Sequence, residues 1–426
     1  MALQNAHPKS AEPSHGRLCN IMRKKLLNLF NITTTNDKLL LTLSFLLFIP
    51  LLFDFIFAMT NGNSGIYSII IYGLSFVVIV FEFVKLVSIK NILIILFLFA
   101  IFAFNMVLFP SSQEYFFRPQ MFILYGYTIP ISFLFLVKIN DWSSFFRIMS
   151  YFGFISIIMA AKVILYVMSI PNLVQEGVFS YMEFSYALSP MLCALFARYL
   201  ETNKYIYLVA YIAGMTEIVA YSSRAALIYA ILFVFIGELY YFKKRKRRFA
   251  CFITILIVGV FFSASITRKI ENSSYFEASY AINRFISGEG SSSESREYIY
   301  KLCRQRINEV GVNVNGFFGD RPFCGSVYPH NLFYEIWMQF GTLIGTIVLL
   351  LLCFLIISSF VKCPNKLVVI FFLLTIFAQF LVSGSYLESG KFWVFLCVLI
   401  SLVRNRKLKR HEYISCKSNL SRTQRI

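Results

Sequence analysis

The sequence predicts an all-α membrane protein that crosses the bilayer about twelve times, and three observations lead to this prediction. Of the 426 residues, 58% are hydrophobic and only 14% are charged, whereas soluble domains carry roughly 25% charged residues. The apolar residues form repeated runs of about 20, the length that a helix needs to cross a hydrocarbon core about 30 Å thick. Basic residues gather beside many of these runs. The composition therefore excludes an ordinary soluble protein.

The apolar runs predict the transmembrane helices in order along the chain. They are Leu39–Met59, Ile66–Val84, Ile92–Phe109, Gln120–Val137, Ile148–Met168, Ser185–Tyr199, Tyr205–Tyr221, Ala225–Phe242, Ala250–Ser265, Gly341–Val361, Leu367–Gly384 and Lys391–Val403. An even number of spans places both ends of the chain on one side. Residues 1–38 then form an N-terminal tail, residues 39–403 the transmembrane domain and residues 404–426 a basic C-terminal tail.

The distribution of Lys and Arg predicts which side of the membrane each loop faces. Both tails are basic next to the first and last spans, and cytoplasmic flanks carry an excess of basic residues. This orientation places most of the 40 basic residues in the cytoplasm, including the run Lys243–Arg248 directly after an apolar stretch. The net charge of +19 is thus interpreted as a topology signal, and a nucleic-acid partner is not expected. We expect a multi-pass protein of the inner membrane with both termini cytoplasmic, and hypothesise that translation starts at Met22.

One connection is much longer than the others and is predicted to face the periplasm. Residues 266–340 form a hydrophilic loop between the ninth and tenth spans, and long loops of this kind are usually functional. Within it we expect a helix over Glu294–Asn308, with serines 291–293 as its N-cap and Gly311 at its end. The segment Gly311–Gly325 is rich in turn residues. Cys303 and Cys324 are the cysteines of this loop, and the sequence leaves open whether they pair.

The end of this loop carries the most specific pattern in the chain. Pro329, His330 and Asn331 precede an amphipathic stretch that we expect to be a helix re-entering the membrane. Gly341 and Gly345 follow as a small-xxx-small pair, which predicts close approach of another helix.

These motifs together resemble those of the O-antigen polymerase and O-antigen ligase superfamily. The resemblance combines the topology with Ser223-Arg224-Ala225, an Arg in the large loop within Ser295-Arg296-Glu297, and the His330-Asn331 pair. It implies a multi-span, lipid-dependent glycosyltransferase that needs no metal and no cofactor. Its catalytic residues would be His330, Arg224 and Arg296.

The chemistry that such a reaction requires agrees with these residue types. A glycan held on a polyprenyl diphosphate departs from a diphosphate, and arginines suit the developing negative charge. A neutral histidine can accept the proton of the attacking hydroxyl. Substrate-binding roles are expected for Asn331, for the loop arginines Arg284 and Arg321, and for Glu217, which lies about two helical turns before Arg224. Asp54, Glu82 and Lys162 are further charges within or at the edges of apolar runs.

The favoured interpretation is a polymerase that joins lipid-linked oligosaccharide repeat units into O-antigen or a related surface polysaccharide. The polyprenyl-diphosphate-linked oligosaccharide would serve as donor and acceptor, membrane lipid would surround the protein, and a chain-length regulator could be a partner. Two alternatives stay open: an O-antigen ligase that transfers the glycan to lipid A core, and a flippase for the lipid-linked oligosaccharide. Ordinary roles are also open at each site residue, namely headgroup anchoring for Arg224, ion pairing for Arg296 and helix capping for His330.

Overall fold

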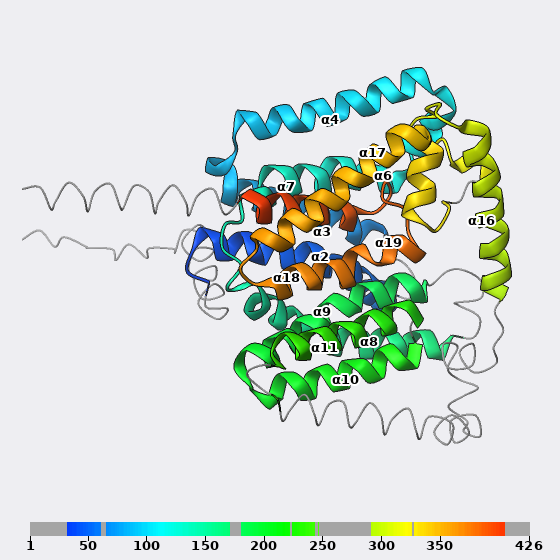
Figure 1. Cartoon of the computed structure of the whole chain (residues 1–426). Helices are drawn as coiled ribbons and strands as arrows, with labels where there is room; N and C mark the ends of the chain where they lie inside the picture. The colour runs from blue at the N-terminus through cyan, green and yellow to red at the C-terminus, as the bar shows by residue number, and fades with distance from the viewer. Residues whose placement is uncertain are drawn as a thin grey trace, which may run out of the picture.

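The structure is a computed structural model that describes seven parts of the chain, residues 32–60, 65–170, 180–221, 224–242, 246, 291–325 and 328–404. Within them the regular elements are helices, and no β-strand occurs. Most helices run along one common direction, and α16 (Ser291–Val310) crosses one end of the array (Figure 1). This end is called the α16 end below. The predicted all-α class is confirmed for the described residues.

Six helical segments are long and apolar enough to cross a membrane among the residues that the structure describes. They are Thr35–Met59 (α2), Gly65–Leu86 (α3, Gly65–Phe83, with its 3-10 extension), Ile89–Leu108 (α4), Pro119–Lys138 (α6, Pro119–Ile123, through α7, Ile129–Leu134), Phe145–Val167 in α8 (Phe145–Ser169), and Leu332–Lys362 (α17). Shorter apolar helices are α10 (Tyr205–Tyr221), α11 (Arg224–Tyr240) and the stretch Lys366–Val382, which contains α18 (Lys366–Phe372) and α19 (Gln379–Val382). The helix α9 (Tyr181–Thr202) and a last helix over residues 390–404 complete the array. The predicted span Ala250–Ser265 and most of both tails lie outside the described residues.

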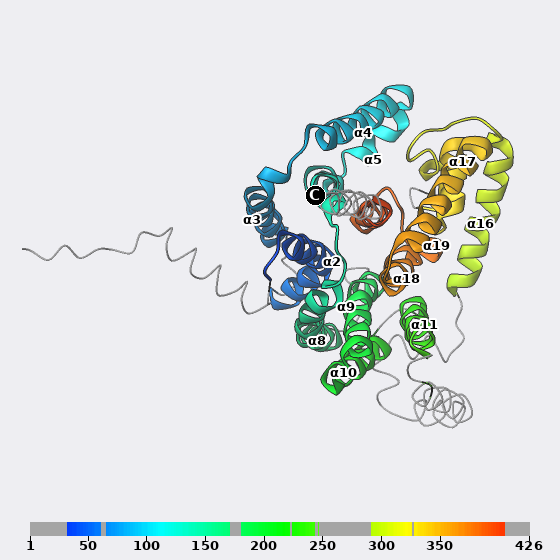
Figure 2. The same cartoon turned by 60° about the vertical axis from the view of Figure 1, so that its left-hand side comes forward.

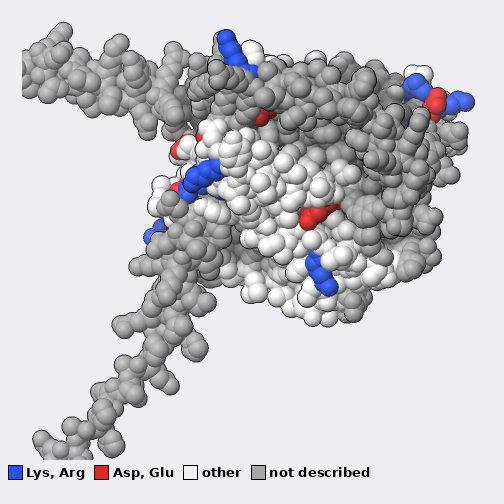
Figure 3. Space-filling model, turned by 90° about the horizontal axis from the view of Figure 1, so that it is seen from below, with Lys and Arg blue, Asp and Glu red and all other residues white. Residues whose placement is uncertain are grey.

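The helices pack around an aromatic and aliphatic core and leave other apolar faces uncovered. α2 packs on α8 and α9, and α9 also contacts α10 and α11. In contrast, Phe81 of α3 and Ile89 of α4 are 78% and 77% exposed. The face in Figure 3 is largely uncharged where residues are described. Such exposed apolar surface is unfavourable in water and suits contact with lipid tails, which supports a membrane protein.

Helix starts follow the capping residues in the sequence. Thr34 and Asp37 form a reciprocal capping box at the start of α2. Ser88 caps α4 with its hydroxyl, which accepts a hydrogen bond from the N–H of Asn91. Ser180 caps α9, and Asn331 caps α17 by accepting hydrogen bonds from the N–H groups of Phe333 and Tyr334. α16 is longer than predicted and begins at Ser291, so the serines expected before the helix lie within its first turn.

α17 consists of two helical pieces that meet at Gly341. Gly341 has φ of 70° and ψ of 171°, a backbone conformation that residues other than glycine rarely adopt. The break separates the predicted re-entry helix from the predicted span, at the predicted residue. The expected approach of another helix to Gly341 and Gly345 is wrong: a Cβ at Gly341 would lie 2.5 Å from the carbonyl oxygen of Asn313, and one at Gly345 would lie 2.9 Å from Trp337. The glycines let α17 fold against its own preceding chain.

Two helical stretches change pitch within their length. Residues Leu124–Thr128 and Leu373–Phe377 form π-helical turns, one between α6 and α7 and one between α18 and α19. Insertions of this kind in membrane helices are frequent at functional sites, because they redirect side chains. Tyr127 and Thr128 of the first turn line the cavity described below.

Candidate functional site

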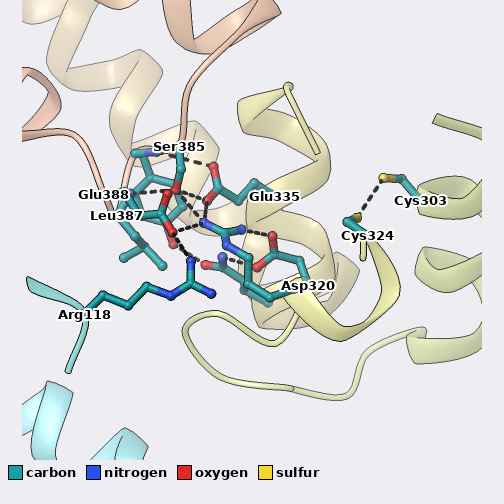
Figure 4. Close-up of polar contacts among 11 residues, drawn as sticks. Arg118, Cys303, Asp320, Cys324, Glu335, Ser385, Leu387 and Glu388 are labelled. Atoms are coloured by element: carbon teal, nitrogen blue, oxygen red, sulfur yellow. Dashed lines mark hydrogen bonds and ion pairs between the residues drawn. The ribbon is translucent and has the colours of Figure 1, made fainter. Parts of the chain in front are cut away.

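A buried arginine organises the chain between α16 and α17. Arg321 has no exposed surface, and it pairs with the neighbouring carboxylate of Asp320 (Figure 4). Its Nη2 donates to Glu335 Oε1 at 3.1 Å and to Ser385 Oγ at 2.8 Å, and it lies 3.5 Å from Glu388 Oε1. We call these five residues the Arg321 cluster. They bring together the loop before α17, the first turn of α17 and the segment after α19.

The carboxylates of the Arg321 cluster have further partners. Glu335 accepts hydrogen bonds from the Ser385 hydroxyl and, at 3.3 Å, from the backbone N–H of Tyr386. Asp320 Oδ1 accepts from Gln339 Nε2 at 2.6 Å. Glu388 also faces Arg118 at 4.0 Å. Buried charges are costly unless they are paired and hydrogen-bonded, and this cluster satisfies both conditions.

The charges of the cluster keep Arg321 protonated, and its guanidinium is engaged by protein carboxylates. Burial alone would lower the pKa of its guanidinium, but the carboxylates of Asp320, Glu335 and Glu388 outweigh that effect and raise the pKa above its ordinary value. The sequence predicted that Arg321 binds substrate, yet in the structure its Nη groups face protein carboxylates in a site closed to solvent. The geometry therefore assigns Arg321 the role of fixing this loop.

His330 lies directly before α17 in a left-handed backbone conformation, with φ of 55°. Its ring packs edge-on against Tyr328 with centroids 4.4 Å apart. Its Nδ1 is buried and has no hydrogen-bond partner among the described residues. Burial, followed by the nearby charges of Arg296 and Arg321, lowers the pKa of His330 to about 4. The imidazole is thus neutral at pH 7, with a ring nitrogen free to accept a proton or a hydrogen bond.

α16 lies over the His330 segment through aromatic contacts. The Tyr300 hydroxyl donates to the carbonyl oxygen of His330 at 3.5 Å, and the rings of Tyr300 and Tyr334 lie 5.3 Å apart. Arg296, one helical turn before Tyr300, is half-buried and near enough to influence the charge state of His330. Two of the three predicted catalytic residues, His330 and Arg296, thus lie near enough for their charges to interact.

Asn331 directly follows His330 in the chain, whereas Glu217, Arg224 and Arg284 are not placed against the pair by any contact among the described residues. Asn331 uses its amide to cap α17 and to donate to the carbonyl oxygen of Leu381 at 3.3 Å. Glu217 is on α10, which packs against α8 and α9, and one of its carboxylate oxygens is buried without a partner among the described residues. Arg224 begins α11, but its side chain lies outside the description, and Arg284 lies outside the described residues entirely.

The two loop cysteines lie close together. Cys303 Sγ of α16 is 3.9 Å from Cys324 Sγ, with both present as thiols (Figure 4). This contact raises the pKa of Cys303 above its ordinary value, with burial as the second cause. The sequence left their pairing open, and the structure places them near enough for small movements to allow it.

A cavity of about 380 Å³ opens beside the Arg321 cluster. Ser385 and Glu388 belong to both, and Tyr328 forms a wall shared with His330. The lining also includes Tyr127, Glu183 and Lys391. Lys391 Nζ donates to the carbonyl oxygen of Tyr186 at 3.1 Å. This volume falls within the range of pockets that hold small ligands. We call it the Lys391 cavity.

The described residues contain no group of three or more His, Cys, Asp or Glu side chains placed to hold a metal ion. Comparisons with protein-family models, with curated proteins and with solved structures found no match for this chain. The function is therefore inferred from the geometry of the site.

Several residues of the site were not predicted from the sequence. Asp320, Glu335 and Glu388 of the Arg321 cluster and Glu183 and Lys391 of the cavity were not assigned any role. One signal was present for Glu335, a carboxylate in an otherwise apolar stretch that begins with Asn331. The run from Ser383 to Lys391 is likewise polar between two apolar helices.

Proposed function

We propose that the protein is a glycosyltransferase of the inner membrane that polymerises oligosaccharide repeat units carried on polyprenyl diphosphate. The observation that supports this best is the buried Nδ1 of His330, which has no hydrogen-bond partner among the described residues, with Arg296 near enough to affect its charge. Tyr328, which packs against the His330 ring, also lines a cavity. A base next to cations suits a reaction in which a hydroxyl attacks and a diphosphate leaves. Twelve spans, cytoplasmic termini and a periplasmic α16 end are part of this proposal.

In the proposed reaction, a hydroxyl oxygen of the incoming lipid-linked unit attacks the anomeric carbon of the growing glycan. The bond from that carbon to the diphosphate oxygen breaks, and the diphosphate departs with the electron pair. His330 receives or orients the hydroxyl proton, while Arg296 and Arg224 stabilise the diphosphate charge. Direct displacement inverts the configuration at the anomeric carbon. No metal or cofactor takes part in this scheme.

The Arg321 cluster would act as a positioning device in this reaction. It fixes the loop that ends at His330 and the first turn of α17, so the imidazole is presented by rigid backbone. Preorganised groups contribute more to a transition state than groups that must first be ordered.

Deletion of the gene in the source strain tests the function, with analysis of surface polysaccharide and of lipid-linked glycan. We expect lipid A core capped by a single repeat unit, which is the product of a cell without the polymerase. Bare core with long glycan accumulating on the carrier would instead establish the ligase. An unchanged polysaccharide ladder would contradict the proposal.

Complementation with variants tests the site. We expect His330→Ala and Arg224→Ala to insert at normal levels and to lose chain growth. Arg304→Ala, an exposed arginine on α16, is the matched control and should restore growth. Normal polymer from both site variants would remove His330 and Arg224 from the mechanism.

A further inference from the structure

The Lys391 cavity has a lining whose chemistry points to a ligand class. Its walls carry hydroxyl groups of Ser383, Ser385 and Ser389, the amide of Gln379 and several tyrosine rings. Hydroxyls and amides can each donate and accept hydrogen bonds, which matches the many hydroxyls of a sugar. Aromatic faces pack against the apolar C–H faces of a ring that is polar at its rim. The rest of the lining is aliphatic and includes Leu46, Ile49 and Val394, so the cavity offers polar groups together with apolar walls.

The charge of the cavity argues against an anionic ligand. Glu183 and Glu388 face it together with a single cation, Lys391. Lys391 already donates to a backbone carbonyl and lies near enough to Glu183 and Asp54 to interact with both. Glu388 is already paired with Arg321 at 3.5 Å and faces Arg118 at 4.0 Å. The one cation among the lining residues is thus engaged by protein groups, and a diphosphate or a uronic acid would find no free positive charge in the lining.

A π-helical turn and Tyr328 also shape the cavity. The π-helical turn Leu124–Thr128 directs Tyr127 and Thr128 into it, and Gly390 packs against Thr128 so closely that a Cβ there would lie 3.0 Å from the Thr128 side chain. Tyr328 forms its boundary towards His330. A ring held in the cavity would thus be adjacent to the segment that carries the proposed base.

We infer that the Lys391 cavity binds an uncharged or amino-bearing sugar ring of the glycan substrate. The inference deepens the proposed function and rests on it for the identity of the whole substrate. The binding step itself is independent of whether polymer forms, so the two can be tested separately.

The experiment is saturation-transfer NMR with the purified full chain in lipid nanodiscs. The probes are N,N′-diacetylchitobiose, glucosamine and glucuronic acid. We expect signals from the first two and none from the anionic glucuronic acid. Ser389→Leu places apolar bulk in the cavity and should reduce the sugar signals about tenfold. Ser169→Leu, at an exposed serine that does not line the cavity, is the matched control and should leave them unchanged.

A second variant guards against misfolding of Ser389→Leu. Glu183→Gln keeps the size of the side chain and removes one carboxylate, so we expect weaker glucosamine signals with little change for the neutral disaccharide. Equal sugar signals in Ser389→Leu and Ser169→Leu, or a signal from glucuronic acid in place of the two other probes, would overturn the inference. Sugar binding in a protein whose deletion leaves the polysaccharide ladder unchanged would uphold the cavity and reject only the polymerase.

Discussion

At Arg321 one guanidinium faces carboxylates from separate parts of the chain, Asp320 and Glu335, with no exposure to solvent. Removing one member of such a group leaves charges buried without a counter-ion, which is far more damaging than losing a surface pair. His330 depends on the same loop, since it lies between the Arg321 segment and α17. The Arg321 cluster and the imidazole of His330 can each be tested by substitution.

For the cluster, we expect Arg321→Met to lower the free energy of unfolding by about 3–5 kcal/mol, because Asp320 and Glu335 lose their cation. The measurement is thermal unfolding of the purified protein in detergent. Glu309→Gln is the matched control, because Glu309 pairs with Arg306 on α16 while 63% exposed. The control should change stability by less than about 1 kcal/mol. Similar losses in the two variants would contradict a structural role for the cluster.

For His330, we expect the protein to lose stability on acidification. The pKa of the folded site is about 4, below the ordinary value of 6.5. Between these values the unfolded chain binds a proton that the folded site does not bind, so stability falls as the pH drops from 6.5 towards 4. The His330→Gln variant has no group at this position that binds a proton in the unfolded chain, so it should lose less stability over the same pH range. Unfolding temperatures measured against pH for the two proteins check this, and superimposable curves would refute the buried, neutral imidazole.

At the scale of elements, the broken helix α17 joins the membrane-spanning part of the chain to the site. The sequence predicted its two halves, an amphipathic helix followed by a span that begins at Gly341, but it did not predict the break in the backbone there. It also predicted the helix around Glu294–Asn308 and the turn-rich segment that follows. It did not predict what approaches Gly341 and Gly345, since those contacts depend on how the chain returns in three dimensions.

The break in α17 requires glycine at position 341, and a substitution can test this. A Cβ there would lie 2.5 Å from the carbonyl oxygen of Asn313, in a backbone conformation with φ of 70°. We expect Gly341→Ala to destabilise the protein by about 1–3 kcal/mol and to disturb the segment before α17. Gly73→Ala is the control, because a Cβ at Gly73 on α3 meets nothing within 4 Å. The measurement is thermal unfolding of both variants. An unchanged unfolding temperature for Gly341→Ala would show that the break is not required.

At the scale of the whole molecule, composition and apolar run length were enough to predict an all-α membrane protein, because the bilayer imposes both on any chain that spans it. The site was less predictable. His330 was found because it is the one histidine outside the two tails, and its neighbour Arg296 followed from the motif. Glu388 and Lys391 were not found, since their partners are distant in the sequence and no periodic pattern marks them.

The proposed orientation predicts which surfaces a membrane-impermeant maleimide can reach. Val312 is 64% exposed at the α16 end, and Lys204 lies in the exposed turn between α9 and α10. In intact spheroplasts, we expect Val312→Cys to be labelled above the background of the native chain and Lys204→Cys to be labelled only after permeabilisation. The reverse pattern would invert the topology and place the proposed reaction on the wrong side for a lipid-linked polymerase.

The reach of the Arg321 cluster along the chain also sets an order for biogenesis. Ser385, which accepts a hydrogen bond from Arg321, is 64 residues further along the sequence. While the ribosome is still making α17 and α18, the guanidinium has Asp320 and Glu335 available but neither Ser385 nor Glu388. The loop before α17 therefore gains its last hydrogen-bond and ion-pair partners only after the residues that follow α19 have been made, so the cluster is completed late in synthesis.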